Sequence, residues 1–238
     1  MGTVTGDADA PISAARLADQ LGTRLPAADS LPSSAFTLVR NVRELVEAVV
    51  MTDVADAELA AAAEAVAAVA ERLRARRRPD ALLLVRHPDG RVESMVQAGS
   101  GRLNPQAPPV EWLVRPTEPP RGSDPVPTEV LARCTFTAAH GGSPGRVYGG
   151  VLALVLDEVL GVAAHAAGAS GMTVSLTVAL KGATPVGRPV SIAGRYTGRD
   201  GRKSYASGEV MVDGKATAEA TAIYVSERRE GDGRRGPP

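Results

Sequence analysis

The chain has 238 residues, of which 44% are hydrophobic and only 3% aromatic, so its core must be built from alanine, valine and leucine. Basic and acidic residues balance at 27 each, so no net field favours nucleic acid or an anionic membrane. The single cysteine, Cys134, excludes a disulfide within one chain, and its strand-like surroundings indicate a buried, inert thiol. Without a secretory signal or a run of roughly 20 uninterrupted apolar residues, we expect a cytoplasmic protein.

The N-terminal part predicts helices after a flexible start. Residues 1–33 are rich in Ala, Asp, Ser and Pro with weak periodicity, which indicates a flexible lead-in. Residues 34–79 predict a helical pair, because both of its runs carry apolar side chains at helical spacing. Such an alanine-rich pair is typical of a packing element or a dimer arm. Residues 80–125 predict a proline-rich linker, within which residues 81–85 could form a short strand.

A strand-rich domain is predicted over residues 126–228, followed by a disordered tail at 229–238. Its first strand is expected at 128–137, then a loop at 138–148 and an apolar helix at 149–167. Four further strands are expected near 172–180, 188–198, 203–213 and 215–226. The Asp-Gly pairs at 200–201 and 213–214 are hairpin signals between the last three strands.

The apolar helix decides the predicted architecture. A helix that is apolar on nearly every side must be enclosed, and an antiparallel sheet curling round one central helix provides that enclosure. We therefore predict an α+β protein with a hot-dog fold and an N-terminal helical extension. Such a sheet leaves an edge strand open, so we expect a homodimer with a continuous sheet, which could pair further into a homotetramer.

Asp157 and Glu158 are unexpected in the middle of this helix, because a buried carboxylate is costly unless it is paired or solvated. Successive helical residues point about 100° apart, so the two side chains should face different environments, one of them a cavity or an interface. At the start of the helix, Tyr148 precedes Gly149 and Gly150, where backbone N–H groups lack intrahelical partners. Such donors can stabilise the oxyanion of a reacting thioester.

These residues resemble a known family. The stretch GSPGRVYGGVLALVLDEVLG at 142–161 is similar to the signature of PaaI-like hot-dog thioesterases, in which PG-x-V-HGG and six mostly apolar residues precede an Asp. The spacing from Gly150 to Asp157 matches without a gap, and residues 172–178 resemble the T-x-x-L-x-V strand of that family. The resemblance covers the C-terminal part of the chain and implies an acyl-CoA thioesterase that needs no metal or redox cofactor.

The resemblance also implies roles for individual residues. Gly149 would match the backbone donor to the thioester oxygen, with Gly150 leaving room for the substrate. Asp157 would match the nucleophile or general base, facing the thioester across the dimer interface. Thr173 would match a position that holds the Asp or the attacking water. In a predicted hairpin turn, the basic pair Arg202 and Lys203 could meet CoA phosphates or form a solvated turn.

Tyr148 departs from the family pattern, because it replaces the usual His. Tyrosine can still donate a hydrogen bond to a carbonyl, but it is bulkier and does not titrate near neutrality. An alternative is therefore a non-catalytic protein of the same fold that binds acyl-CoA or an acyl carrier. A hydroxyacyl dehydratase would need a His and an acid where this chain has Gly142 and Leu154. The three histidines are scattered and do not predict a metal site.

Overall fold

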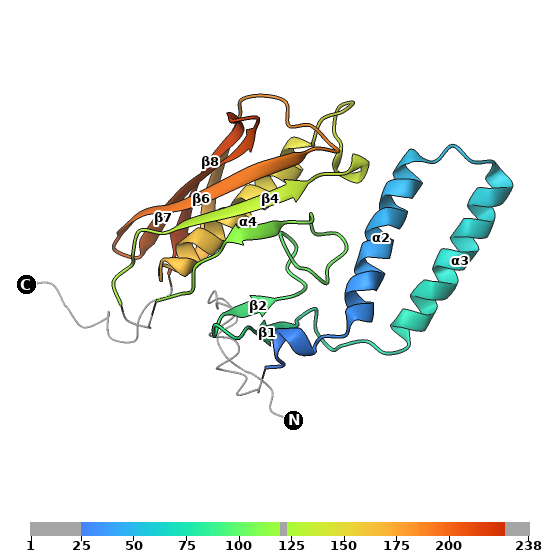
Figure 1. Ribbon diagram of the computed structural model, residues 1–238, viewed down its shortest axis with the longest axis horizontal. Coiled ribbons are helices and arrows are strands. Elements are labelled where there is room, and N and C mark those ends of the chain that lie inside the picture. The colour runs from blue at the N-terminus through green and yellow to red at the C-terminus, as the bar shows by residue number, and fades with distance from the viewer. Residues whose placement is uncertain (1–24, 120–122, 227–238) are drawn as a thin grey trace, which may run out of the picture.

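The computed structural model describes residues 25–119 and 123–226 (Figure 1). Most of the predicted lead-in and all of the predicted tail lie outside these residues. A short turn of 3-10 helix, η1 (Ala28–Ser30), precedes the helices α2 (Ser33–Met51) and α3 (Asp56–Arg74), which form the expected helical pair. This pair projects to one side of the main body (Figure 1).

Helix α2 joins the pair to the rest of the protein. Arg43 donates a hydrogen bond from Nη2 to the carbonyl oxygen of Asn104 at 3.0 Å. The Glu47 carboxylate accepts one from the backbone N–H of Ala138 at 3.3 Å. Helix α3 buries none of its residues in the described chain, so it leaves an apolar stripe open to solvent.

The main body is one helix against one antiparallel sheet, which confirms the predicted α+β hot-dog fold. The sheet has the strand order β3-β4-β6-β7-β8-β5, and every adjacent pair is antiparallel. Its strands are β3 (Glu111–Val114), β4 (Glu129–Thr135), β5 (Met172–Leu180), β6 (Pro189–Asp200), β7 (Lys203–Val212) and β8 (Lys215–Val225). The central helix is α4 (Gly149–Ala166), which lies along one face of the sheet (Figure 1).

The chain reverses where the sequence predicted hairpins. Asp213 and Gly214 have φ values of 50° and 76°, as a tight turn with two left-handed residues requires. Gly201, with φ 55°, closes the turn between β6 and β7 in the same region of conformational space. These two turns fix the register of β6, β7 and β8.

The expected linker contains more structure than its prolines suggested. Strand β3 pairs with β4, so the main sheet already begins at Glu111 rather than near residue 126. Two further strands, β1 (Leu84–Arg86) and β2 (Val92–Ser94), form a separate hairpin whose Val85 is fully buried. The prolines of this segment lie outside all three strands, so they remove no ladder hydrogen bond.

Small residues on the sheet allow α4 to approach closely. The inner face of the sheet carries alanines opposite the buried leucines and valines of the helix: Ala132, Ala206, Ala218, Ala220 and Ala222. At the centre, a Cβ atom on Gly194 would come within 2.9 Å of Val159 Cγ1 and 3.0 Å of the Val159 carbonyl oxygen. By length and composition α4 could cross a membrane, a test that buried core helices also pass.

We expect Gly194→Ala to destabilise the protein by about 1–3 kcal/mol, because the new methyl group forces the helix backbone away from the sheet. The measurement is the urea midpoint of unfolding. Gly182→Ala is the matched control, since its Cβ would come no closer than 3.9 Å to any neighbour. Equal midpoints for the two variants would show that the close contact at Val159 does not limit packing.

Candidate active site

The N-terminus of α4 presents two glycine N–H groups. Gly149 and Gly150 are the first two residues of the helix. Their N–H groups therefore have no hydrogen-bond acceptor within the helix. Tyr148 occupies the N-cap position with no side-chain capping bond, and 61% of its surface is exposed. A Cβ on Gly150 would come within 2.7 Å of the Tyr148 ring, and one on Gly149 within 2.8 Å of Leu180 Cδ1. The two glycines thus let Tyr148 and Leu180 pack beside open donors.

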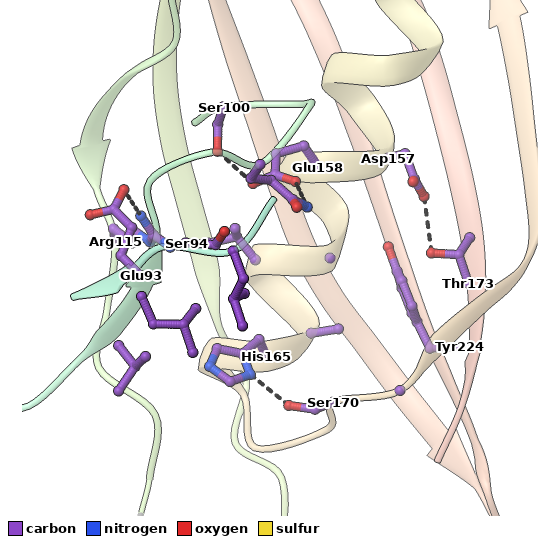
Figure 2. A pocket seen from close by; sticks show the side chains of 18 residues that line it. Glu93, Ser94, Ser100, Arg115, Asp157, Glu158, His165, Ser170, Thr173 and Tyr224 are labelled. Carbon is purple, nitrogen blue, oxygen red and sulfur yellow. Dashed lines mark hydrogen bonds and ion pairs between the residues drawn. The ribbon is translucent and has the colours of Figure 1, made fainter. Parts of the chain in front are cut away.

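Asp157 is held in place by strand β5. Thr173 donates a hydrogen bond from Oγ1 to Asp157 Oδ1 at 3.1 Å (Figure 2). Strict alternation along residues 173–180 would have placed Thr173 on the face opposite Leu176. A bulge adds Val174 between the paired residues Thr173 and Ser175, and both Thr173 and Leu176 therefore face α4. The bulge is thus the feature that aims Thr173 at Asp157.

Glu158 points to a different partner, the loop that follows β2. Ser100 donates from Oγ to Glu158 Oε1 at 2.5 Å, and Gln97 donates from Nε2 to Oε2 at 2.9 Å. The loop passes so close that a Cβ on Gly99 would come within 2.6 Å of Glu158 Cβ. A side chain at position 99 would therefore push this loop off the helix.

A cavity of about 420 Å³ lies between α4, strand β5 and residues 82–100 (Figure 2). Asp157 and Glu158 both line it, although their side chains have different partners. The expectation that they face different environments is therefore wrong for the cavity itself, which spans more than one face of the helix. Arg115, His165 and Tyr224 also contribute to the polar part of its wall.

An ion-pair cluster supports the wall formed by β1 and β2. The Glu93 carboxylate is 5% exposed and contacts His87 Nε2 at 2.5 Å and Arg115 Nη1 at 3.1 Å. Burial alone would raise the pKa of Glu93, but the charge of Arg115 and the hydrogen bond from His87 outweigh it. The pKa of Glu93 therefore lies below its ordinary value of 4.5.

This cluster predicts a pH-dependent contribution to stability. Because the folded pKa of Glu93 is lowered, its contribution is present above the unfolded pKa and is lost as the pH falls through the folded pKa. Glu93→Gln should therefore lower the urea midpoint at neutral pH, and its deficit relative to wild type should shrink below about pH 4.5. An equal deficit at neutral and acidic pH would contradict an ionised Glu93.

The two ends of α4 separate the predicted site residues within one chain. Leu180, at the far end of β5, lies against Gly149, whereas Thr173, near the start of β5, contacts Asp157. Lys203 pairs with Val225 on β8, the strand that also pairs with the start of β5. Arg202 and Lys203 therefore lie at the Thr173 end of the sheet and away from the glycine donors. Arg202 donates a hydrogen bond from Nε to the carbonyl oxygen of Ser226 at 3.0 Å.

Cys134 is buried as predicted, and burial raises the pKa of its thiol to about 12, so it stays protonated and unreactive near neutral pH. Among the described residues, no group of three His, Cys, Asp or Glu side chains could hold a metal ion. His165 instead shares a hydrogen bond with Ser170, in which Nδ1 and Oγ are 2.6 Å apart, and both residues line the cavity.

Two parts of the cavity were missed by reasoning from the sequence. Residues 82–100 and Arg115 come from the expected linker, and their only signal was the short apolar run that became β1. Tyr224 lies on the inner face of β8. It is the one tyrosine in a strand composed mainly of alanine and threonine, and this could have marked it in the sequence.

Comparisons with known proteins identify the family. No family profile and no curated protein matches the chain. A crystal structure of a thioesterase superfamily protein matches at 30% identity and a TM-score of 0.68, over 86% of this chain and 94% of its own. A phenylacetic acid degradation-related protein from Ralstonia eutropha is 28% identical over 41% of this chain and 75% of its own, with a TM-score of 0.38. A thioesterase protein from Streptococcus pneumoniae, crystallised with coenzyme A, is 16% identical over 50% of this chain and 90% of its own, with a TM-score of 0.43. Because the first match spans nearly all of both proteins, the chain belongs to the thioesterase superfamily.

Proposed function

We propose that the protein is an acyl-CoA thioesterase in which Asp157 is the nucleophile or the general base. The observation that carries this proposal is the hydrogen bond that fixes Asp157 to Thr173 at the rim of the cavity. A carboxylate on a buried helix is expensive unless it has such a partner and a polar opening beside it. Membership of the thioesterase superfamily supports thioester hydrolysis as the reaction class.

In the proposed reaction, the Gly149 N–H donates to the thioester oxygen as negative charge develops on it. Open N–H groups at a helix N-terminus favour negative charge, and such donors act most strongly where water is excluded. Asp157 either attacks the carbonyl carbon or removes a proton from the attacking water, and the CoA thiolate then leaves. Tyr148 covers Gly150 with its ring and leaves its hydroxyl free to contact the substrate.

The site is proposed to need two subunits. Eight residues separate Gly149 from Asp157 along α4, which corresponds to about 12 Å of helix rise. One thioester cannot contact both residues of the same chain. Pairing two chains antiparallel would bring the Gly149 of one subunit to the Asp157 of the other. Arg202 and Lys203 lie at the Asp157 end of the sheet, where they could meet CoA phosphates.

The surface supports such a homodimer. Leu154, on α4, remains 38% exposed although eight other residues of the helix are buried. Strand β5 pairs with β8 alone among the described strands, so its other edge is open. Apolar Val174 and Leu180 are exposed on β5. A second copy would cover these side chains and continue the sheet, as an open edge strand favours.

The experiment that tests the function offers the wild-type protein a panel of short, medium, long and aromatic acyl-CoAs. Hydrolysis is measured as the release of free CoA thiol. Turnover of any member supports the proposal and identifies the acyl class. Tight binding of acyl-CoA without turnover would overturn it and favour a binding protein in which Tyr148 has replaced the chemistry. The oligomeric state is measured on the same sample by light scattering.

A further inference from the structure

The hydroxyl group of Tyr224 is a buried donor directed at the cavity. Tyr224 is 2% exposed and is the cross-strand neighbour of Thr173, so both side chains face α4. Its ring stands beside the helix with the oxygen directed toward the level of Asp157 (Figure 2). At the helix, a Cβ on Gly161 would lie in ordinary van der Waals contact with this oxygen, at 3.9 Å.

Tyr224 Oη has no hydrogen-bond partner within the described residues. Four buried side-chain atoms in that part of the chain lack a partner, and Tyr224 alone among their residues lines this cavity. A buried hydroxyl without a partner costs free energy that a phenylalanine would avoid. Burial, together with the nearby charges of Asp157 and Glu158, raises the pKa of Tyr224, so the hydroxyl stays protonated and remains a donor.

The two glutamates of the cavity already have partners. Glu158 is held by Ser100 and Gln97, and Glu93 by Arg115. The cavity therefore offers an arriving group one unused buried donor. Its carboxylates outnumber its arginine, which disfavours a negatively charged acyl group. Residues 82–100 line the cavity with both apolar and polar side chains: Leu82, Leu84 and Val92, and Glu93, Ser94, Gln97 and Ser100. An acyl group that carries one polar atom suits such a mixed wall better than a plain alkyl tail.

We propose that this cavity receives a short acyl group carrying an uncharged oxygen, a hydroxyl or a keto group, and that Tyr224 Oη donates a hydrogen bond to that oxygen. The proposal rests on the proposed thioesterase function and names its substrate class. Tyr224 is then a specificity-determining residue rather than a catalytic one, because it contacts the acyl end and not the reacting carbon.

The test compares butanoyl-CoA with 3-hydroxybutanoyl-, 4-hydroxybutanoyl- and 3-oxobutanoyl-CoA, using wild type and Tyr224→Phe. In wild type, kcat/KM for at least one oxygenated substrate should exceed that for butanoyl-CoA by about tenfold or more, since the oxygenated chain gives the unpaired donor a hydrogen bond that the plain chain cannot give. Tyr224→Phe should reduce this ratio to near one by slowing the oxygenated substrate. Succinyl-CoA should be hydrolysed more slowly than the hydroxyacyl substrates. An unchanged ratio, or an equal loss with all substrates, would overturn the proposal.

A second measurement separates this proposal from the proposed function. Binding of the same CoA thioesters to Asp157→Asn and to Asp157→Asn with Tyr224→Phe is measured by calorimetry, which needs no turnover. If wild type hydrolyses nothing but binding still shows the preference that Tyr224→Phe removes, the function fails and the pocket assignment stands. If turnover occurs and neither rate nor binding depends on Tyr224, the pocket assignment fails alone. Thermal melting should show Tyr224→Phe at least as stable as wild type, because it removes only an unpaired hydroxyl.

Discussion

Asp157→Asn is expected to lower kcat for acyl-CoA hydrolysis by about 10²–10⁴-fold, the range that a positioned acid–base group contributes. The amide keeps the shape of the side chain and can still accept the hydrogen bond from Thr173, so the fold should be preserved. It can neither attack a carbonyl nor accept a proton from water. The measurement is steady-state release of CoA, with KM and melting temperature recorded for each variant.

Two variants give this prediction its controls. Glu158→Gln makes the same chemical change one residue along the same helix, where Ser100 and Gln97 hold the carboxylate, and it should cost far less. Thr173→Val removes the hydrogen bond to Asp157 and should reduce kcat by an intermediate amount, on the order of tenfold. If Asp157→Asn retained activity within the range of Glu158→Gln, the assignment of Asp157 would be wrong.

The helix and the hairpins could be predicted because their signals are local. An apolar run that begins at Gly149, after a loop rich in glycine and proline, leaves little choice about where α4 begins. The Asp-Gly pairs fix the turns around β7 because they tolerate positive φ. Because the start of α4 could be predicted, the position of Asp157 within the helix could be predicted as well.

The wall of the cavity could not be predicted, because it depends on contacts between distant parts of the chain. Ser100 and Glu158 are 58 residues apart, and no periodicity in residues 80–125 indicates that they meet. The prolines there indicated a linker, whereas β3 fits between them. In the same way, strict alternation along β5 would not place Thr173 and Leu176 on one face, since a bulge depends on how the neighbouring strand pairs.

Gly149→Pro is expected to lower kcat by about 10²–10³-fold, the loss seen when one oxyanion donor is removed. Proline lacks the backbone N–H but is favoured at the first position of a helix. Tyr148, which precedes it, already has the extended backbone that a residue before proline adopts, with φ −65° and ψ 134°. The substitution therefore deletes the proposed donor without breaking α4.

Gly149→Ala is the matched control for this variant. Both substitutions place a Cβ near Leu180 Cδ1, which lies 2.8 Å from the ideal position and is the end of a flexible side chain. Only proline removes the N–H. Alanine should therefore lose much less activity than proline, and equal losses would show that the packing against Leu180, not the donor, is what the reaction needs.

Mixing the two inactive proteins tests whether the site is shared between subunits. Each shared site takes Asp157 from one subunit and Gly149 from the other. In a heterodimer of Asp157→Asn and Gly149→Pro chains, one site therefore carries both substitutions, and the other combines an intact Asp157 with an intact Gly149. Random exchange of subunits should therefore restore about one quarter of wild-type activity, since half of the dimers are mixed and each has one intact site. If both residues acted within one chain, every site in the mixture would carry a lesion and no activity would return. Because about 12 Å of helix separates the two residues in one chain, we expect restoration.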